Sequence, residues 1–302
     1  MTVSFRPYRP GVDFDAVNAL LARTYPPDDR HDNWTPARWQ YMVHSVCDGD
    51  ETRLADVGLW WEGEPDHSRV VAVTTHEGEP GEAYFQVGLA HLELKREMLA
   101  YAEAHLSREA AGRRTLVAYI NSWDTALGAL AAEAGFVQLR DQPEWTSRLV
   151  LPEVFAPVAL PPGYRITDRA ERDDLEAINR VLWRGFNHEG PPPEEHVASR
   201  ACVERAPLYR PELHVMIEAP EGHLVSYCGT WYHPDLRMTY VEPVATDPDY
   251  RRLGLGRACV LEAVRRTHAL GATRALVGSD QPFYQALGFE RSHVYYPWRK
   301  EW

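Results

Sequence analysis

The chain repeats part of its own sequence. Residues 15–18 read Asp-Ala-Val-Asn and residues 176–179 read Glu-Ala-Ile-Asn, and a leucine, an arginine and an aromatic residue follow each at the same spacing, with an offset of 161 residues. Near the ends of the halves, Ala-Gly-Phe at 134–136 matches Leu-Gly-Phe at 287–289, with an offset of 153. A repeat on this scale spans whole domains rather than one helix. We therefore expect two halves that share one fold.

A proline-rich segment separates the halves. Residues 151–163 contain four prolines and almost no charge, so they cannot continue a helix or a central strand. We read them as a semi-rigid linker between a domain at 1–150 and a domain at 164–302. In a chain of 302 residues, each domain is large enough to bury a core without disulfides or metals.

Charge and cysteine spacing exclude several classes of partner. The 44 acidic residues against 32 basic ones give a net charge of −12, which disfavours a nucleic-acid surface and suits an amine-bearing small molecule. The cysteines, at 47, 202, 228 and 259, have no metal-binding spacing and fit free thiols in a reducing compartment. No apolar run has the length of a membrane span or of a signal peptide. We expect a cytoplasmic protein without a metal or a membrane partner, and the sequence leaves its oligomeric state open.

The patterning in each half predicts strand, helices, strands, helix, strand, helix and strand. The fold class that follows is α/β (α+β), with a mixed, mostly antiparallel twisted sheet flanked by helices in each half. Each element is assigned from its hydrophobic period and the turn residues beside it. In the first half we expect a strand at 82–87 and a helix at 95–110; in the second half, strands at 164–167, 213–218, 224–232, 238–246, 275–277 and 292–298 and helices at 173–184, 257–270 and 283–287.

A basic, glycine-rich loop before a helix carries the clearest chemical signal. Residues 251–256 read Arg-Arg-Leu-Gly-Leu-Gly, and the expected helix follows. A glycine-rich loop at a helix N-terminus exposes several backbone N–H groups at the positive end of the helix dipole, which suits a phosphate chain. A P-loop needs Lys-Ser/Thr after its last glycine, but Arg257-Ala258 follows Gly256 here. A dinucleotide fingerprint fits poorly too, because Cys259 stands at its third small position and no βαβ unit surrounds it.

Two motifs together resemble a known family. The first is Tyr250-Arg251-x-x-Gly254-x-Gly256, and the second, about thirty residues later, is Phe-Tyr-x-x-Leu-Gly-Phe at 283–289. In this order, over 164–302, they are similar to the GNAT acyltransferases (GCN5-related N-acetyltransferases), whose R-x-x-G-x-G/A loop binds the pyrophosphate of acetyl-CoA. The resemblance implies a tandem member that transfers an acetyl group from acetyl-CoA directly to the primary amine of a small molecule. Many relatives carry an asparagine in a longer stretch where this chain has only Ser-Asp-Gln-Pro at 279–282.

The resemblance also implies which residues contact the acyl donor. In that family the central strand is bulged and splays from the next one, and the pantetheine arm lies in the opening; Pro243, which cannot donate to a ladder, predicts such a bulge. Backbone N–H groups near Val244 and Ala245 are expected to stabilise the oxyanion. The cofactor-binding residues that we expect are Val244, Ala245, Thr246, Arg251, Arg252, Leu253, Gly254, Leu255, Gly256 and Arg257.

Glu242 and Tyr284 are the expected catalytic residues. Strand alternation puts Glu242 on one face with Val244, a costly place for a carboxylate without a use. It stands where many GNAT enzymes place the base that deprotonates the acceptor amine, and Tyr284 stands where they place the acid that protonates the thiolate of CoA. A carboxylate at Trp302 is an alternative base, because some tandem relatives use their C-terminal carboxylate. A solvent-facing glutamate and a packed core tyrosine are the simpler structural readings.

The first half lacks the basic, glycine-rich loop of the second half. Residues 88–94 offer one glycine and no R-x-x-G-x-G, and Ala132 stands four residues before Gly135, where the tyrosine would be. We therefore expect a degenerate copy that supports the second half or forms a wall of the acceptor site. A non-catalytic acyl-CoA-binding or sensing protein is the alternative of a different class. Mycothiol synthase and the aminoglycoside-acetylating tandem enzymes are the alternatives within the family.

Overall fold

The structure, a computed structural model, describes residues 2–25, 34–45, 51–63, 68–78, 80–110 and 112–302. The chain forms two compact units. Unit 1 comprises Met1–Met42, Asp48–Thr146 and Ser292–Trp302, and unit 2 comprises Val43–Cys47 and Ser147–Arg291. Within the described ranges, no helix is both long and apolar enough to cross a membrane.

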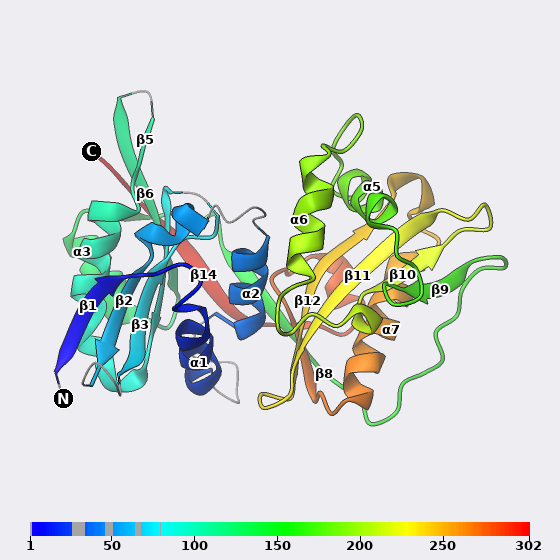
Figure 1. The fold of residues 1–302 in the computed structure, drawn as a ribbon, viewed down its shortest axis with the longest axis horizontal. Helices are drawn as coiled ribbons and strands as arrows, with labels where there is room; N and C mark the ends of the chain where they lie inside the picture. Colours follow the sequence, from blue (N-terminus) through cyan, green and yellow to red (C-terminus); the bar gives the residue numbers. More distant parts are fainter. Residues whose placement is uncertain (1, 26–33, 46–50, 64–67, 79, 111) are drawn as a thin grey trace. The chain divides into compact units, whose positions relative to one another are not determined.

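Unit 1 contains one sheet with the strand order β1-β2-β3-β4-β6-β14 (Figure 1). β4 and β6 are parallel and the other neighbours are antiparallel. The sides of helices α3 and α4 that face the sheet supply its core with Met98, Leu99 and Leu127. The strands are β1 (Val3–Pro7), β2 (Gly58–Glu62), β3 (Arg69–Thr75), β4 (Glu82–Val87), β5 (Arg108–Ala110), β6 (Arg113–Asn121), β7 (Val137–Gln138) and β14 (Glu290–Glu301), and the helices are α1 (Phe14–Thr24), α2 (Pro36–His44), α3 (Lys95–His105) and α4 (Thr125–Glu133).

Unit 2 repeats this arrangement, with the strand order β9-β10-β11-β12-β13-β8 (Figure 1). β12 and β13 are the parallel pair. Met216 packs with helix α5 on one face, whereas its neighbours Val215 and Ile217 pack with α7 on the other, as the alternation of a strand requires. The strands are β8 (Glu144–Val150), β9 (Arg165–Asp168), β10 (Val215–Glu218), β11 (Leu224–His233), β12 (Met238–Thr246) and β13 (Arg274–Val277), and the helices are α5 (Leu175–Gly185), α6 (Glu195–Val203), α7 (Leu255–Ala269) and α8 (Pro282–Gln285).

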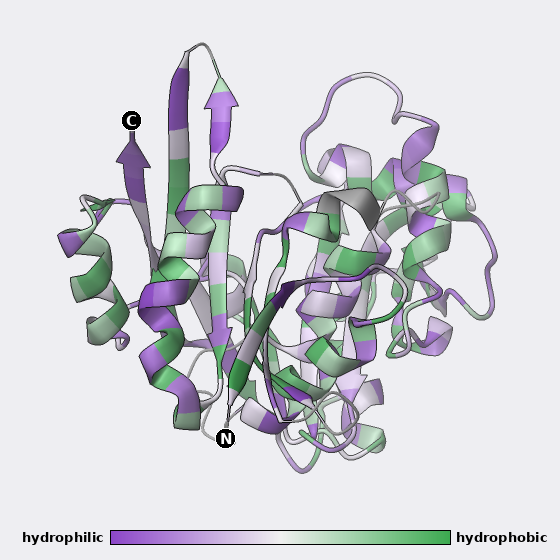
Figure 2. Ribbon diagram, turned by 60° about the vertical axis from the view of Figure 1, so that its left-hand side comes forward, coloured by the Kyte–Doolittle hydropathy of each residue, from purple (hydrophilic) through white to green (hydrophobic). Residues whose placement is uncertain are grey.

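The repeat and its patterning thus led to the right fold class: two mixed, mostly antiparallel sheets flanked by helices. The helices carry hydrophobic and hydrophilic residues side by side (Figure 2), as layers packed on a sheet require. α5, expected at 173–184, spans Leu175–Gly185, and it begins after Asp174 because the Asp174 side chain accepts a hydrogen bond of 2.9 Å from the N–H of Ala177.

The last strand of each half belongs to the sheet of the other unit. β8 pairs with β13 in unit 2, and β14 pairs with β6 in unit 1. The compact units therefore differ from the expected ranges 1–150 and 164–302. Because the two halves offer the same kind of sheet edge, local pattern could not tell which edge a terminal strand would join.

The segment at 151–163, expected to be a linker between domains, is part of unit 2. Its apolar residues Phe155, Val158 and Leu160 lie against the core formed with α7, and the Phe155 ring is 5.3 Å from that of His268. The segment has no helix or strand, as its prolines predicted.

Two further expectations were wrong. The helix expected at 95–110 ends at His105, and Arg108–Ala110 forms β5, which pairs with β6. Cys202 is disulfide-bonded rather than free. Cys228 and Cys259 are buried free thiols, and Cys47 lies outside the described residues.

Candidate active site

The site lies where β12 and β13 separate. Met238, Thr239 and Tyr240 pair with residues 274–276, but β13 ends at Val277 while β12 continues to Thr246. Among the described residues, β12 beyond Tyr240 pairs only with β11. One edge of β12 is therefore open to a ligand along 241–246.

A bulge bends β12 at this opening. Val241 pairs with Thr230 and Val244 with Cys228, so Gly229 alone faces Glu242 and Pro243. A Cβ atom on Gly229 would lie 2.5 Å from the Glu242 carbonyl oxygen, and this close approach requires glycine. The bulge predicted from Pro243 is confirmed.

The bulge also changes which side chains share a face. Val241 and Val244 both pack against the core on the α7 side, although they are an odd number of residues apart. The expected common face of Glu242 and Val244 is therefore wrong, because the extra residue reverses the alternation. Val244 and Ala245 pair with Cys228 and Tyr227 of β11, directly after the bulge.

The glycine-rich loop presents a row of backbone donors. Gly254, with φ of 79°, is the N-cap of α7, a helix of 15 residues. Within the described part of the chain, none of the N–H groups from Arg252 to Arg257 donates to another protein group. Six successive donors without a protein acceptor at a helix N-terminus are an arrangement that can bind an anion, so the anion site expected from the sequence stays a prediction.

The two glycines of the loop serve different purposes. A Cβ atom at Gly254 would meet nothing within 4 Å, so this position needs glycine for its positive φ. A Cβ atom at Gly256 would lie 2.9 Å from Thr246 Oγ1 and 3.5 Å from the Phe283 ring. Gly256 therefore lets α7 approach the end of β12.

The arginines of the loop do not all face the anion site. The Arg251 guanidinium donates to the carbonyl oxygens of Thr246, at 3.2 Å, and Gly185, at 2.8 Å, so it ties the loop to the end of α5. Arg257 donates to the Ala286 carbonyl oxygen at 3.3 Å. Arg252 and Leu253 are exposed. No sequence pattern predicted the ion pair of Arg184 with Asp247, which joins α5 to the residue that precedes this loop region.

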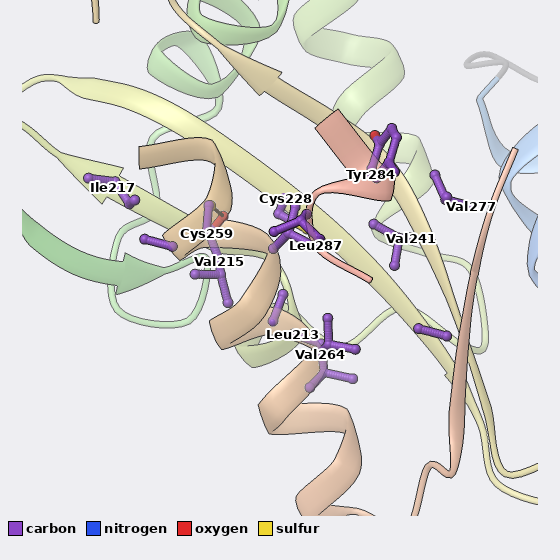
Figure 3. Packing of buried hydrophobic residues seen from close by; sticks show 14 of the residues in the cluster. Leu213, Val215, Ile217, Cys228, Val241, Cys259, Val264, Val277, Tyr284 and Leu287 are labelled. Atoms are coloured by element: carbon purple, nitrogen blue, oxygen red, sulfur yellow. Dashed lines mark hydrogen bonds between the residues drawn. The ribbon is translucent and has the colours of Figure 1, made fainter. Parts of the chain in front are cut away.

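Tyr284 lies on α8 with its ring in the core. Figure 3 shows the ring beside Val277 and Val241, and the ring centroid is 5.0 Å from that of Phe283 and 5.7 Å from that of Phe289. Its hydroxyl donates to no group among the described residues. Burial raises the pKa of Tyr284 well above its usual value, so the phenol stays protonated at neutral pH.

Glu242 is half-buried at the bulge. After burial, the charges of Cys228 and Glu242 contribute to the raised pKa of Tyr284. The backbone of Glu242 is fixed by Trp231, whose Nε1 donates to the Glu242 carbonyl oxygen at 2.9 Å. Trp302 lies in unit 1, where its N–H donates to the Arg114 carbonyl oxygen.

Residues 175–289 match the sequence model of the Acetyltransferase (GNAT) family. Among curated proteins, the glucosamine 6-phosphate N-acetyltransferase of Trypanosoma brucei brucei is 29% identical over 87 residues, which are 26% of this chain and 58% of the relative. The mycothiol acetyltransferase of Salinispora arenicola is 30% identical over 139 residues, which are 44% of this chain and 43% of the relative. The chain thus matches about half of the length of each of these relatives.

Two solved structures resemble nearly the whole chain. A tandem GNAT protein from the clavulanic acid biosynthesis pathway has a TM-score of 0.65 at 15% identity, covering 99% of this chain and 98% of its own. A GCN5-related N-acetyltransferase from Sphaerobacter thermophilus has a TM-score of 0.59 at 19% identity, covering 99% of this chain and 95% of its own. At this identity the likeness concerns the fold, and it extends to both halves.

Proposed function

We propose that the second unit, in which residues 175–289 match the GNAT family model, transfers an acetyl group from acetyl-CoA to a primary amine of a small molecule. The likeness in fold of both halves to a tandem GNAT protein supports this proposal. One observation carries the proposal. The six free N–H groups from Arg252 to Arg257 stand at the end of β12, whose edge is open from Val241 to Thr246. A diphosphate on the loop would therefore lead a pantetheine arm along an unpaired strand edge, toward Glu242 and Tyr284.

The proposed reaction is a direct transfer in a ternary complex. The amine attacks the thioester carbonyl, a C–N bond forms and the C–S bond breaks. Glu242 takes the proton that the amine loses, through water, and Tyr284 gives its proton to the departing thiolate. Backbone N–H groups near Val244 and Ala245 stabilise the oxyanion between these steps. The raised pKa of Tyr284 supports its role, because only the neutral phenol can donate.

The acceptor is a small molecule in this proposal. The curated relatives are named for glucosamine 6-phosphate and mycothiol, both small molecules, and the excess of acidic residues, 44 against 32 basic, attracts a protonated amine.

Thiol release from acetyl-CoA tests the proposal. The purified protein is incubated with acetyl-CoA and, one at a time, with amino sugars and their phosphates, amino acids, polyamines and aminoglycosides, and free CoA is measured against a control without amine. We expect amine-dependent release with at least one acceptor. Tight binding of acetyl-CoA by calorimetry without release for any amine would favour the sensing protein instead.

The number of acetyl-CoA molecules bound per chain tests whether only the second half binds the acyl donor. The segment between β4 and α3, residues 88–94, has one glycine, and the N–H of His91 already donates to the Gly88 carbonyl oxygen. We propose that unit 1 has a supporting role and that calorimetry finds one acetyl-CoA per chain. Two equivalent sites would contradict this.

A further inference from the structure

The opening between β4 and β6 in unit 1 contains a cavity of its own. These strands pair at Glu82 with Val117 and at Ala83 with Ala118, and no further pair joins them in the described structure. A cavity of about 330 Å³ lies between the separated strand ends and α4. This volume is at the lower end of the range for small-molecule sites.

The cavity is mainly apolar, and apolar side chains surround it. Phe85, Ile120 and Leu127 are at least nine-tenths buried and line it from β4, β6 and α4. Three further lining residues are large, apolar and exposed: Leu89 at 68%, Leu92 at 43% and Trp123 at 39%. Large apolar side chains exposed around a cavity are typical of a binding site rather than of an ordinary surface.

One charged group in the cavity has more hydrogen-bond donors than acceptors. The Lys95 side chain is 10% exposed, and its Nζ lies 2.6 Å from Asp124 Oδ2. Asp124 is the only partner of this ammonium among the described residues, although an ammonium has three N–H donors. Asp124 is itself fixed, because its Oδ1 accepts the N–H of Leu127 at 2.9 Å as the N-cap of α4.

The chemistry of this pair favours an uncharged ligand. Asp124 already balances the charge of Lys95, so a second carboxylate would be desolvated without a free countercharge. A carbonyl oxygen can accept from the remaining N–H donors at a lower cost, and buried donors are normally satisfied in this way. In the segment at 88–94, which has one glycine, the N–H groups of Gly88 and His91 already donate to the carbonyl oxygens of Val71 and Gly88.

We propose that unit 1 binds, between β4 and β6, an uncharged and mainly apolar small molecule with a carbonyl group that accepts a hydrogen bond from Lys95. The ligand carries no phosphate, in contrast to the donor proposed for unit 2. The proposal does not depend on the activity of unit 2.

N-benzylacetamide is a suitable probe, because it joins an aromatic ring to a neutral amide carbonyl. Its binding to the full chain is measured by calorimetry and by ligand-observed NMR. Ala126→Trp fills the cavity from an exposed lining position on α4, and Ala129→Trp, exposed on the same helix but outside the lining, is the matched control. We expect saturable binding that Ala126→Trp weakens at least tenfold and that Ala129→Trp leaves unchanged.

The hydrogen bond from Lys95 to the ligand is tested by Lys95→Met combined with Asp124→Asn. This double substitution removes both charges together and keeps a capping oxygen on α4. We expect this variant to bind the amide about tenfold more weakly, the effect of losing a hydrogen bond to a charged donor. Phenylacetate, the carboxylate counterpart, should bind wild type more weakly than the amide does. Equal binding to the Ala126→Trp variant, tighter binding of phenylacetate, displacement of the amide by CoA, or no binding at millimolar concentration would each overturn the proposal.

Discussion

Arg184 holds Asp247 through two hydrogen bonds, of 2.6 Å from Nε to Oδ2 and 3.0 Å from Nη2 to Oδ1. Asp247 directly follows β12, and its Oδ1 also accepts the N–H of Asp249 at 3.1 Å. Since Arg251 donates to the Gly185 carbonyl oxygen, the end of α5 is joined to the loop at two points. The position of the anion site therefore depends on α5 as well as on its own glycines.

Asp247→Asn should weaken acetyl-CoA binding. Asparagine keeps one oxygen for the N–H of Asp249 but loses the charge that pairs with Arg184. The pKa of Asp247 is lowered, because the hydrogen bonds and charge of Arg184 outweigh the opposing effect of burial. We expect a loss of about 1–3 kcal/mol of unfolding free energy, typical of a broken partly buried ion pair, together with a higher KM for acetyl-CoA.

The control is Asp249→Asn, because this carboxylate also pairs with Arg184 but its side chain is 76% exposed. Its effect on KM and on urea unfolding should be much smaller. Equal effects of the two substitutions would mean that the buried contact does not position the loop.

Gly256→Ala should separate a packing effect from a ligand effect. The added methyl would lie 2.9 Å from Thr246 Oγ1, so α7 must shift away from β12 and the melting temperature should fall. Thr246→Ala removes the atom that it meets, and the double variant should regain stability relative to Gly256→Ala alone. If the diphosphate contacts the loop, acetyl-CoA affinity measured by calorimetry stays low in the double variant. Full recovery of affinity would show that Gly256 acts through packing only.

The sequence predicted the structure correctly where neighbouring residues determine it. β12 has the predicted bounds Met238–Thr246, and the loop that ends in Gly256 leads into a helix as predicted. Both follow from alternation, proline and glycine, which act on neighbouring residues. The bulge at Pro243 was foreseen, but the change of face that it causes requires the register against β11.

Contacts between distant residues could not be predicted. Arg184 and Asp247 are 63 residues apart, and no pattern in the chain links them. The exchange of β8 and β14 has the same cause, since each strand pairs with a strand that is far away in the sequence. Arg251 was expected to contact the phosphates of acetyl-CoA, but its guanidinium donates to two backbone carbonyl oxygens.

Tyr284→Phe should reduce turnover by about 10²–10⁴, the range of general acid catalysis, with little change in acetyl-CoA affinity. The ring contacts with Phe283 and Phe289 remain, so the fold should be preserved. Because the pKa of Tyr284 is raised, wild-type turnover should not fall from ionisation of this phenol as the pH rises to its ordinary pKa, about 10.

A tyrosine from the same core serves as the control for this substitution. Tyr232→Phe removes a hydroxyl that donates to the Leu270 carbonyl oxygen at 2.9 Å, and it should lower stability without lowering turnover. If Tyr284→Phe behaved in the same way, Tyr284 would be a core residue only.

His214 should make unit 2 sensitive to acid. The ring is 1% exposed, and its Nδ1 lies 2.6 Å from the Tyr227 hydroxyl. Burial, and then the charges of Arg200 and Arg169, lower the pKa of His214 to about 3. The unfolded chain takes up this proton near pH 6.5 and the folded chain only near pH 3, so stability falls as the pH drops through this window.

Urea unfolding at pH 8 and pH 5 measures this effect. His214→Gln cannot take up the proton, so it should lose less stability between the two pH values than wild type does, although its stability at pH 8 is lower. An equal loss in both proteins would show that other groups dominate acid unfolding.

Glu242→Gln tests the proposed base. Glutamine keeps the shape of the half-buried side chain at the bulge but cannot accept the proton of the amine. The rate at saturating amine should fall by about 10²–10⁴, and the acidic limb of the kcat/KM profile should disappear, because that limb reports protonation of the base. Binding of acetyl-CoA should change little, since the loop donors lie beyond the other end of the opening. Glu221→Gln, at an exposed position in unit 2, is the control and should keep both the rate and the limb. A fall in rate with the limb intact would show that Glu242 only positions other groups and that another residue accepts the proton.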